Sequence, residues 1–386
     1  MTKHRYIALD VLRGLAILGT LGTNVWIFTN AEGFVGYVNG TGDATGVWAP
    51  VQDVLQQLAQ GKFLGLLTIM FGIGLAVQQR SAVKRGARWP GNYPVRAGLL
   101  MLDGVLHYFL FTEFDVLMGY AFTGLVVAFV LASSIRAQRI WTICAVALHT
   151  AMLALLVAAL AFAPALDPEP LSPNPYADGS FWDLVVFRLE NIQIFRLEVI
   201  FILPMSIALF LVGARLFGRG ILDPECAQLR RKLMLFGFGV ALPLDFALGL
   251  FGSDAGLVLG RYGTAPFVSL AILAAVAHRY VVEPEPGLIG KALVPLGRTA
   301  LTCYVLQNFL CSVICYGWGF GLSARLTGET LVPATVAVFV GVSATMIAAS
   351  TLWLRRFDRG PLEWLWNASY QRLTGKSQER SAVPVA

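Results

Sequence analysis

The chain has 386 residues, of which 56% are hydrophobic and only 13% are charged. An average soluble domain carries roughly twice that charged fraction, so the composition excludes a water-soluble globule. The formal net charge of +6 is interpreted as a topology signal of a membrane protein, not as a nucleic-acid-binding surface.

Continuous apolar runs predict membrane-spanning helices, because a bilayer core of about 30 Å needs roughly 20 apolar residues per helix. Apolar and polar residues do not alternate along these runs, which argues against a membrane β-barrel. We therefore predict an all-α, polytopic integral membrane helix bundle. About ten transmembrane helices are expected, at 7–28, 55–77, 95–111, 116–132, 140–162, 199–217, 233–251, 262–280, 299–319 and 332–354.

The first span carries Asp10 and Arg13, which lie three residues apart and so share one helix face. Lys3 and Arg5 precede this span but no small-residue cleavage site follows it, so we expect an uncleaved first helix. Two readings of the Asp10–Arg13 pair stay open. It neutralises itself and fixes helix packing, or it holds a phosphate or another anion at the cytoplasmic side.

Lys62 is expected in the outer part of the second span. It either extends to the outer headgroups or stabilises a developing oxyanion. Asn24, near the outer end of the first span, is a hydrogen-bond donor that could join it. Asp245, in the seventh run, follows Pro243. Its role, structural or coupling, stays open.

Asp103 and His107 lie four residues apart in the third run, on one helix face. A carboxylate one turn away can accept the proton of one imidazole nitrogen and leave the other nitrogen as a base. Asp115 follows in the short outer turn and is a second candidate partner. The alternative is a histidine that only satisfies a polar helix contact.

The stretch 163–180 is rich in proline and acidic residues and predicts an outer loop, and 181–197 predicts a helix in the outer interface. We therefore divide the chain into an N-terminal five-span half (1–162), the loop and interfacial helix (163–198), a C-terminal five-span half (199–369) and a polar tail (370–386). No internal sequence repeat is evident.

The basic residues sort by side when the N-terminus is placed in the cytoplasm. Cytoplasmic segments then hold 23 Lys and Arg, outer segments hold four, and two lie within spans. The positive-inside rule therefore predicts that both termini are cytoplasmic. Five Cys, without a CxxC motif, and four His give neither a disulfide framework nor a multi-histidine site, so no metal is expected.

Several motifs resemble those of the YeiB-like bacterial inner-membrane proteins, the DUF418 type, whose C-terminal part is of unknown function. The first span opens with LDVLRGLA at 9–16. Later come GRTALTCYVLQ at 297–307, GWGFGL at 317–322 and GPLEWLW at 360–366. The resemblance implies a multi-pass protein of the bacterial inner (cytoplasmic) membrane.

YeiB-like proteins are in turn distantly similar to transmembrane acyltransferases such as heparan-alpha-glucosaminide N-acetyltransferase. That resemblance implies a cytoplasmic acyl-CoA, an acceptor at the outer face and a histidine reached from outside. The outer loop 29–54 has no His, so this role would fall to His107, oriented by Asp103 or Asp115. Lys62 with Asn24 would stabilise the oxyanion. The residues expected near the acyl donor are Asp10, Arg13, Arg298 and Gln307.

Two other functions stay open. A small-molecule transporter or exporter would use Asp103, His107 and Asp245 to relay protons or bind substrate. A non-catalytic membrane partner would use the same polar residues only for helix packing. In each case the partners expected are the lipid bilayer and a small-molecule, lipid or sugar ligand, but no nucleic acid. Whether the chain forms an oligomer stays open.

Overall fold

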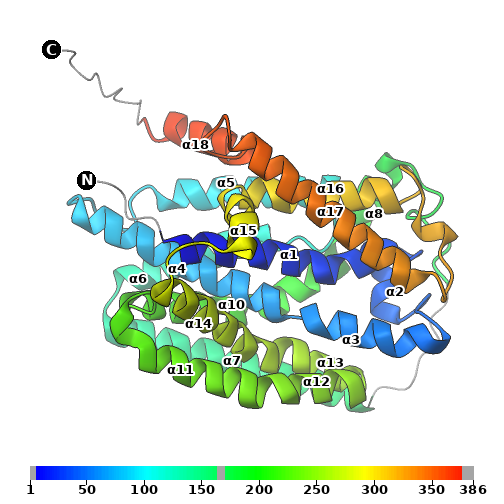
Figure 1. The fold of residues 1–386 in the computed structure, drawn as a ribbon, viewed down its shortest axis with the longest axis horizontal. Helices are drawn as coiled ribbons and strands as arrows, with labels where there is room; N and C mark the ends of the chain where they lie inside the picture. The colour runs from blue at the N-terminus through cyan, green and yellow to red at the C-terminus, as the bar shows by residue number, and fades with distance from the viewer. Residues whose placement is uncertain (1–5, 163–169, 376–386) are drawn as a thin grey trace.

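The computed structural model of the protein describes residues 6–162 and 170–375, and all regular structure among these residues is helical. Figure 1 shows the helices as a bundle with their long axes roughly aligned. Seven helical stretches in the described part are long and apolar enough to cross a membrane. They are Ile7–Thr29, Gly46–Lys84, Ile135–Phe162, Ile192–Gly218, Pro224–Phe251, Asp254–Val282 and Leu331–Trp353. The predicted all-α, polytopic membrane fold is confirmed at this level.

The first half of the chain forms seven α-helices. Their bounds are α1 Ile7–Thr29, α2 Gly33–Asn39, α3 Ala49–Ala59, α4 Lys62–Lys84, α5 Tyr93–Leu110, α6 Leu117–Ala132 and α7 Ile135–Phe162. The predicted runs 95–111 and 116–132 are helical as α5 and α6, which fall outside the set of seven long spans. The start of the predicted outer loop, 163–169, lies outside the described residues.

The second half begins with the helix expected in the outer interface, which is divided in two at Asn191. Its elements are α8 Phe181–Glu190, α9 Ile192–Phe195, α10 Leu197–Gly218, α11 Ala227–Phe236, α12 Leu242–Phe251, α13 Asp254–Leu259, α14 Ala265–Val282, α15 Leu288–Arg298, α16 Ala300–Cys315, α17 Leu331–Trp353 and α18 Pro361–Leu373. Helix α18 extends beyond residue 369, into the segment expected to be a polar tail. The rest of that tail, 376–386, is outside the described residues.

Helix α1 lies in the middle of the bundle (Figure 1), and its side chains Leu12, Ala16 and Leu21 have no exposed surface. It packs closely on α15. A Cβ added at Gly14 would lie 2.2 Å from the carbonyl oxygen of Leu293, and one at Gly297 would lie 1.8 Å from that of Asp10. The LRG and GRT motifs therefore supply the two glycines that let these helix backbones approach.

Three of the predicted spans are not continuous α-helices. The run 55–77 is divided at Gly61, which has a φ of +72° and separates α3 from α4. The π-helical segment η3, Gly237–Ala241, precedes α12 within the run 233–251, and the π-helical segment η4, Gly260–Thr264, precedes α14 near the start of 262–280. Hydropathy does not reveal these features, because a glycine turn or one inserted residue leaves the hydropathy of the run unchanged.

The helix surface that faces away from the bundle is strongly apolar. Helix α7 buries only Ala145, His149 and Leu153, while Ile143 and Leu155 are mostly exposed. A soluble protein rarely leaves such a long apolar face uncovered. The face is suited to contact with lipid chains.

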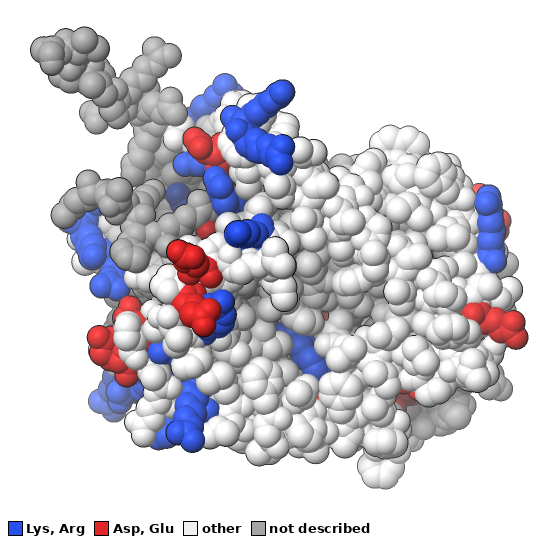
Figure 2. Space-filling model, viewed as in Figure 1, with Lys and Arg blue, Asp and Glu red and all other residues white. Residues whose placement is uncertain are grey.

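Charged side chains gather at one end of the molecule (Figure 2). We call it the basic end. It is defined by the last turns of α4, α10 and α17 and the segments that follow them, with Lys84, Arg215, Arg219, Arg355 and Arg356. Helix α1 begins at this end and α18 lies on it (Figure 1). Helices α2 and α8 lie at the opposite end.

Candidate functional site

The imidazole of His107 is held by the carboxylate of Asp115. Nδ1 of His107 lies 2.9 Å from Oδ1 of Asp115, and both side chains are fully buried. His107 is in the last turn of α5, and Asp115 stands in the turn before α6, where its second oxygen accepts a hydrogen bond from the backbone N–H of Met118 (3.1 Å). The carboxylate therefore both binds the first turn of α6 and orients the imidazole.

The other imidazole nitrogen faces α16. Nε2 of His107 lies 3.0 Å from Nδ2 of Asn308, and the amide oxygen of Asn308 accepts a hydrogen bond from Asn24 on α1 (3.4 Å). Because an amide nitrogen only donates, Nε2 must be the acceptor and Nδ1 must carry the proton. The tautomer of His107 is thus set by Asp115 on one side and Asn308 on the other.

Asp103 does not hold the imidazole, although it is on the same face of α5. Its Oδ2 is buried and has no hydrogen-bond partner among the described residues. Of the two candidate partners, Asp103 and Asp115, the structure pairs His107 with Asp115. The physical reason is that the turn 111–116 reverses the chain and brings Asp115 to Nδ1, the position that the i,i+4 carboxylate was expected to take.

A buried ion pair closes the site on the side opposite the basic end. Nε of Arg188 on α8 lies 3.1 Å from Oε2 of Glu113, and its other nitrogens donate to the carbonyls of Phe109 and Phe111 at the end of α5. The hydroxyl of Tyr176 donates to Oε1 of Glu113 at 2.6 Å. Burial, with the nearby Glu113 charge, raises the pKa of Tyr176 well above its ordinary value, so the hydroxyl keeps its proton.

Arg196 adds a second cation beside this pair. Its guanidinium donates to the backbone carbonyl of Glu113 and to that of Asp115 (3.0 Å), and it lies 4.1 Å from the centre of the Tyr108 ring. The turn that carries Asp115 is therefore held by two arginines from the α8–α10 region. The sequence indicated no partner for Glu113, since Arg188 is 75 residues away.

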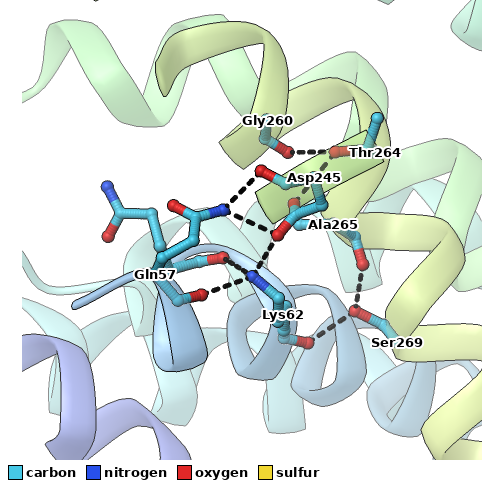
Figure 3. Close-up of polar contacts among 8 residues, drawn as sticks. Gln57, Lys62, Asp245, Gly260, Thr264, Ala265 and Ser269 are labelled. Carbon is cyan, nitrogen blue, oxygen red and sulfur yellow. Dashed lines mark hydrogen bonds and ion pairs between the residues drawn. The ribbon is translucent and has the colours of Figure 1, made fainter. Parts of the chain in front are cut away.

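Lys62 lies in a different cluster from His107. Its ammonium forms an ion pair with Asp245 on α12 and donates to the carbonyls of Gln57 (2.6 Å) and Gln60 (3.5 Å). Figure 3 shows these groups pointing toward one another between α3, α4, α12 and α14. In the described part of the chain, no hydrogen bond or ion pair joins Lys62 to Asn24 or His107. The expected pairing of Lys62 with Asn24 is therefore absent here.

The carboxylate of Asp245 is fully satisfied. Its Oδ2 also accepts from Nε2 of Gln57 (2.7 Å), and its Oδ1 accepts from the hydroxyl of Thr264 (2.9 Å) (Figure 3). Both Lys62 and Asp245 are buried. The cluster stands where α3 gives way to α4, where η3 precedes α12, and where η4 precedes α14. One helix break, at Gly61, and two π-helical segments thus lie close to one ion pair.

The residues expected near an acyl donor are dispersed. Asp10 and Arg13 pair with each other at 3.5 Å, as their spacing indicated, and Arg298 donates to the carbonyl of Asp358 (3.0 Å) near the basic end. Gln307 is buried next to Asn308, and its amide nitrogen lies 3.5 Å from the hydroxyl of Thr20. Gln307 thus lies beside the His107 site, one residue from Asn308.

The GPLEWLW and GRTALT motifs meet at the start of α16. Oε1 of Glu363 accepts hydrogen bonds from the backbone N–H groups of Leu301 (2.7 Å) and Thr302 (3.2 Å), and Oε2 accepts from the hydroxyl of Thr302 (2.6 Å). These N–H groups belong to the first turn, which has no partners within the helix. The glutamate of one motif therefore caps the helix that the other motif begins.

No group of three or more His, Cys, Asp and Glu side chains that could hold a metal ion occurs among residues 6–162 and 170–375. What the site offers is a neutral imidazole, amide donors and buried carboxylates. Such groups suit proton transfer and hydrogen bonding.

The three C-terminal motifs lie within a segment that matches a known protein family. Residues 216–372 match the family model described as "Protein of unknown function (DUF418)". Over 96% of its length the chain is 25% identical to 95% of the uncharacterized protein YxaH of Bacillus subtilis (strain 168). Over 98% of its length it is 26% identical to the whole of the uncharacterized protein YeiB of Escherichia coli (strain K12). The predicted YeiB-like, DUF418-type resemblance is confirmed.

Proposed function

We propose that this multi-pass membrane protein of YeiB-like type is an acyltransferase in which His107 acts as the general base. The observation that carries the proposal is the row Asp115–His107–Asn308. A buried carboxylate fixes one tautomer of an imidazole, and the free nitrogen of that imidazole meets an amide donor. A neutral, oriented histidine is the group that general-base catalysis of acyl transfer requires.

The proposed step begins when an acceptor hydroxyl or amine replaces the Asn308 amide at Nε2. The acceptor gives its proton to Nε2 of His107, and its heteroatom bonds to the thioester carbonyl carbon. The carbon–sulfur bond then breaks, and the proton passes from His107 to the leaving thiolate. Asp115 stabilises the imidazolium that exists between the two transfers.

The amides of Asn308 and Asn24 are the proposed oxyanion donors, in place of Lys62. Asn308 lies 3.0 Å from Nε2 of His107, so once displaced its N–H group is within reach of an oxygen formed there. Preorganised donors in a buried site stabilise a developing oxyanion strongly. Lys62 has all three N–H groups engaged in its own cluster and takes no part in this step.

The proposed donor is an acyl-CoA that reaches the site from the basic end. Arg298 lies there, at the start of the α15–α16 junction, and Asp10 and Arg13 are in the first turns of α1. Along α16 the rise of about 1.5 Å per residue gives roughly 9 Å from Thr302 to Asn308. The acceptor, a small molecule or a lipid or sugar, would enter past Arg196 from the opposite end.

The proposed orientation places the basic end in the cytoplasm of a bacterial inner membrane, following the positive-inside rule. Ten crossings then follow if α5, α6 and α16 cross together with the seven longer stretches. In this arrangement both termini are cytoplasmic, and α8 lies along the outer interface.

The test uses purified protein in liposomes made from bacterial lipids, with radiolabelled acetyl-CoA outside. We expect release of free CoA thiol and transfer of label to a lipid or to an added sugar. His107→Ala should lower the rate by about 10²- to 10⁴-fold. The matched control is His149→Ala, because His149 is also buried but, among the described residues, its side chain hydrogen-bonds only to the carbonyl of Tyr262 (3.0 Å). Equal rates in the His107 variant and the control would refute the assignment.

A second candidate, proton-coupled transport, is favoured by the Lys62–Asp245 cluster. Discontinuous helices that meet at buried charged groups are typical of substrate and ion sites in secondary transporters, and π-helical segments often occur at functional sites. Liposomes that contain a pH-sensitive dye would report proton movement without any acyl donor. Proton movement that is lost in Asp245→Asn and kept in His107→Ala would favour transport over acyl transfer.

A further inference from the structure

A cavity of about 1630 Å³ lies between the end of α17, the segment 354–360 and α18. Three arginines line it: Arg356, Arg359 and Arg372. Three aromatic side chains line it as well: Trp353, Phe357 and Trp364. The cavity is at the basic end, apart from both the His107 site and the Lys62–Asp245 cluster.

The three arginines of this cavity are exposed and lack ion-pair partners among the described residues. None of its three arginines forms an ion pair or a side-chain hydrogen bond with any residue of 6–162 or 170–375. Among the described residues of the lining, Asp358 is the one carboxylate, and the nearby Glu363 is engaged at the start of α16. The described lining thus holds three arginines against one aspartate, a balance that favours an anion.

Side-chain contacts hold the two walls of the cavity in place. The rings of Trp353 and Phe357 stack with centroids 4.3 Å apart, and the indole N–H of Trp353 donates to the carbonyl of Arg359 (2.8 Å). Helix α18 is held on its other face, where Tyr370 lies 4.4 Å from the guanidinium of Arg96 on α5. A preformed basic cavity binds an anion without first having to be ordered.

The rim of the cavity is apolar and open. Trp364 is 67% exposed and Leu365 is 56% exposed, both on α18, and Leu352 on α17 is 58% exposed. Tryptophans beside arginines at the end of an apolar helix are the side chains that anchor a protein at the headgroup level of a bilayer. A soluble anion would leave these apolar side chains uncovered, whereas a phospholipid would cover them with its chains.

We infer that this cavity binds the phosphate headgroup of an anionic phospholipid, with the acyl chains lying against Trp364 and Leu365. The arginines provide charge-assisted hydrogen bonds to the phosphate oxygens. The inference does not depend on the proposed acyl transfer, because it concerns none of the residues around His107.

The test compares lipid retention by native mass spectrometry in a neutral detergent. The wild-type chain is expected to retain dioleoyl-phosphatidylglycerol in preference to dioleoyl-phosphatidylcholine. The triple variant Arg356→Gln, Arg359→Gln, Arg372→Gln should lose about 10- to 100-fold in apparent affinity for the anionic lipid. The triple Arg→Lys variant should recover most of it, which separates lost charge from lost folding.

The matched control is Arg136→Gln, Arg139→Gln, Arg231→Gln, which removes the same charge from exposed positions outside the cavity. It should retain the anionic lipid like the wild type. Equal losses in both triple variants would overturn the inference, as would displacement of the lipid by millimolar inorganic phosphate. Loss of a dimer mass, without loss of lipid, in the cavity variant would instead assign the surface to a second copy of the chain and would also overturn it.

Discussion

Glu363 and Thr302 join two helices that are about sixty residues apart in the chain, through a hydrogen bond of 2.6 Å from the hydroxyl to the carboxylate. The same carboxylate accepts two backbone N–H groups of α16, and the Thr302 hydroxyl accepts one from Leu362 on α18 (3.1 Å). The first turn of α16 and the first turn of α18 are therefore capped reciprocally. The ALT and GPLE motifs therefore form one structural unit in this chain.

Replacing Glu363 should destabilise the protein through this cap. Glu363→Ala leaves two N–H groups of α16 without an acceptor, at a cost of about 1–3 kcal/mol. Glu363→Gln keeps one acceptor oxygen and should lose less. Thermal unfolding of the purified proteins in detergent should give the highest melting temperature for the wild type, a lower one for the Gln variant and the lowest for the Ala variant. If the Ala variant has the melting temperature of the wild type, the cap does not stabilise the native bundle.

Asp115 and Asp103 should differ sharply in the proposed reaction. Asp115→Asn removes the carboxylate that fixes the His107 tautomer, so we expect a loss of about 10²- to 10⁴-fold in CoA release. Asp103→Asn should keep a rate within a few-fold of the wild type, because no bond joins Asp103 to the imidazole. The assay is the liposome assay described for His107. A variant of Asp103 as inactive as that of Asp115 would return the orienting role to the i,i+4 pair.

Lys62 and Asp245 should be strongly coupled in stability. Lys62→Met leaves the buried Asp245 charge uncompensated, and Asp245→Asn leaves the ammonium uncompensated, each at a cost of about 3–5 kcal/mol. The double variant removes both charges and should be more stable than the sum of the single losses predicts. Thermal melts of the four proteins form the cycle. Strictly additive losses would mean that the two charges do not interact.

Gly297 should not tolerate a side chain, whereas Gly341 should. A Cβ at Gly297 would lie 1.8 Å from the carbonyl oxygen of Asp10, but one at Gly341 on α17 meets nothing within 4 Å. Gly297→Ala therefore forces α15 away from α1, at about 1–3 kcal/mol. Gly341→Ala should be neutral or stabilising, because alanine favours the helix. Melting temperatures of the two variants provide the comparison.

Hydropathy located the helices well because an apolar run of about 20 residues has few alternatives in a bilayer. It could not locate the helix break at Gly61 or the π-helical segments η3 and η4, since these features change the backbone and leave the composition of the run unaltered. Helical spacing correctly paired Asp10 with Arg13. It was misleading at His107, because the partner lies beyond a chain reversal that periodicity does not encode.

The long-range pairs could not be derived from one sequence for the same reason. Arg188 with Glu113 and Lys62 with Asp245 depend on which helices become neighbours, and neither is signalled by local spacing. Asn308 differs from these pairs, because its polar side chain within an apolar run was recognisable in the sequence, next to Gln307. Nothing in the run indicated that Asn308 faces a histidine.

The Lys62–Asp245 cluster also has a consequence for how the protein is made. Gln57, which bonds to Asp245, precedes it by 188 residues, and at a ribosomal rate of about 5–20 residues per second this interval takes roughly 10 to 40 s. During that time Lys62 is without the Asp245 carboxylate that pairs with it in the finished fold. A chain that stops before α12 therefore leaves this ammonium without its ion-pair partner.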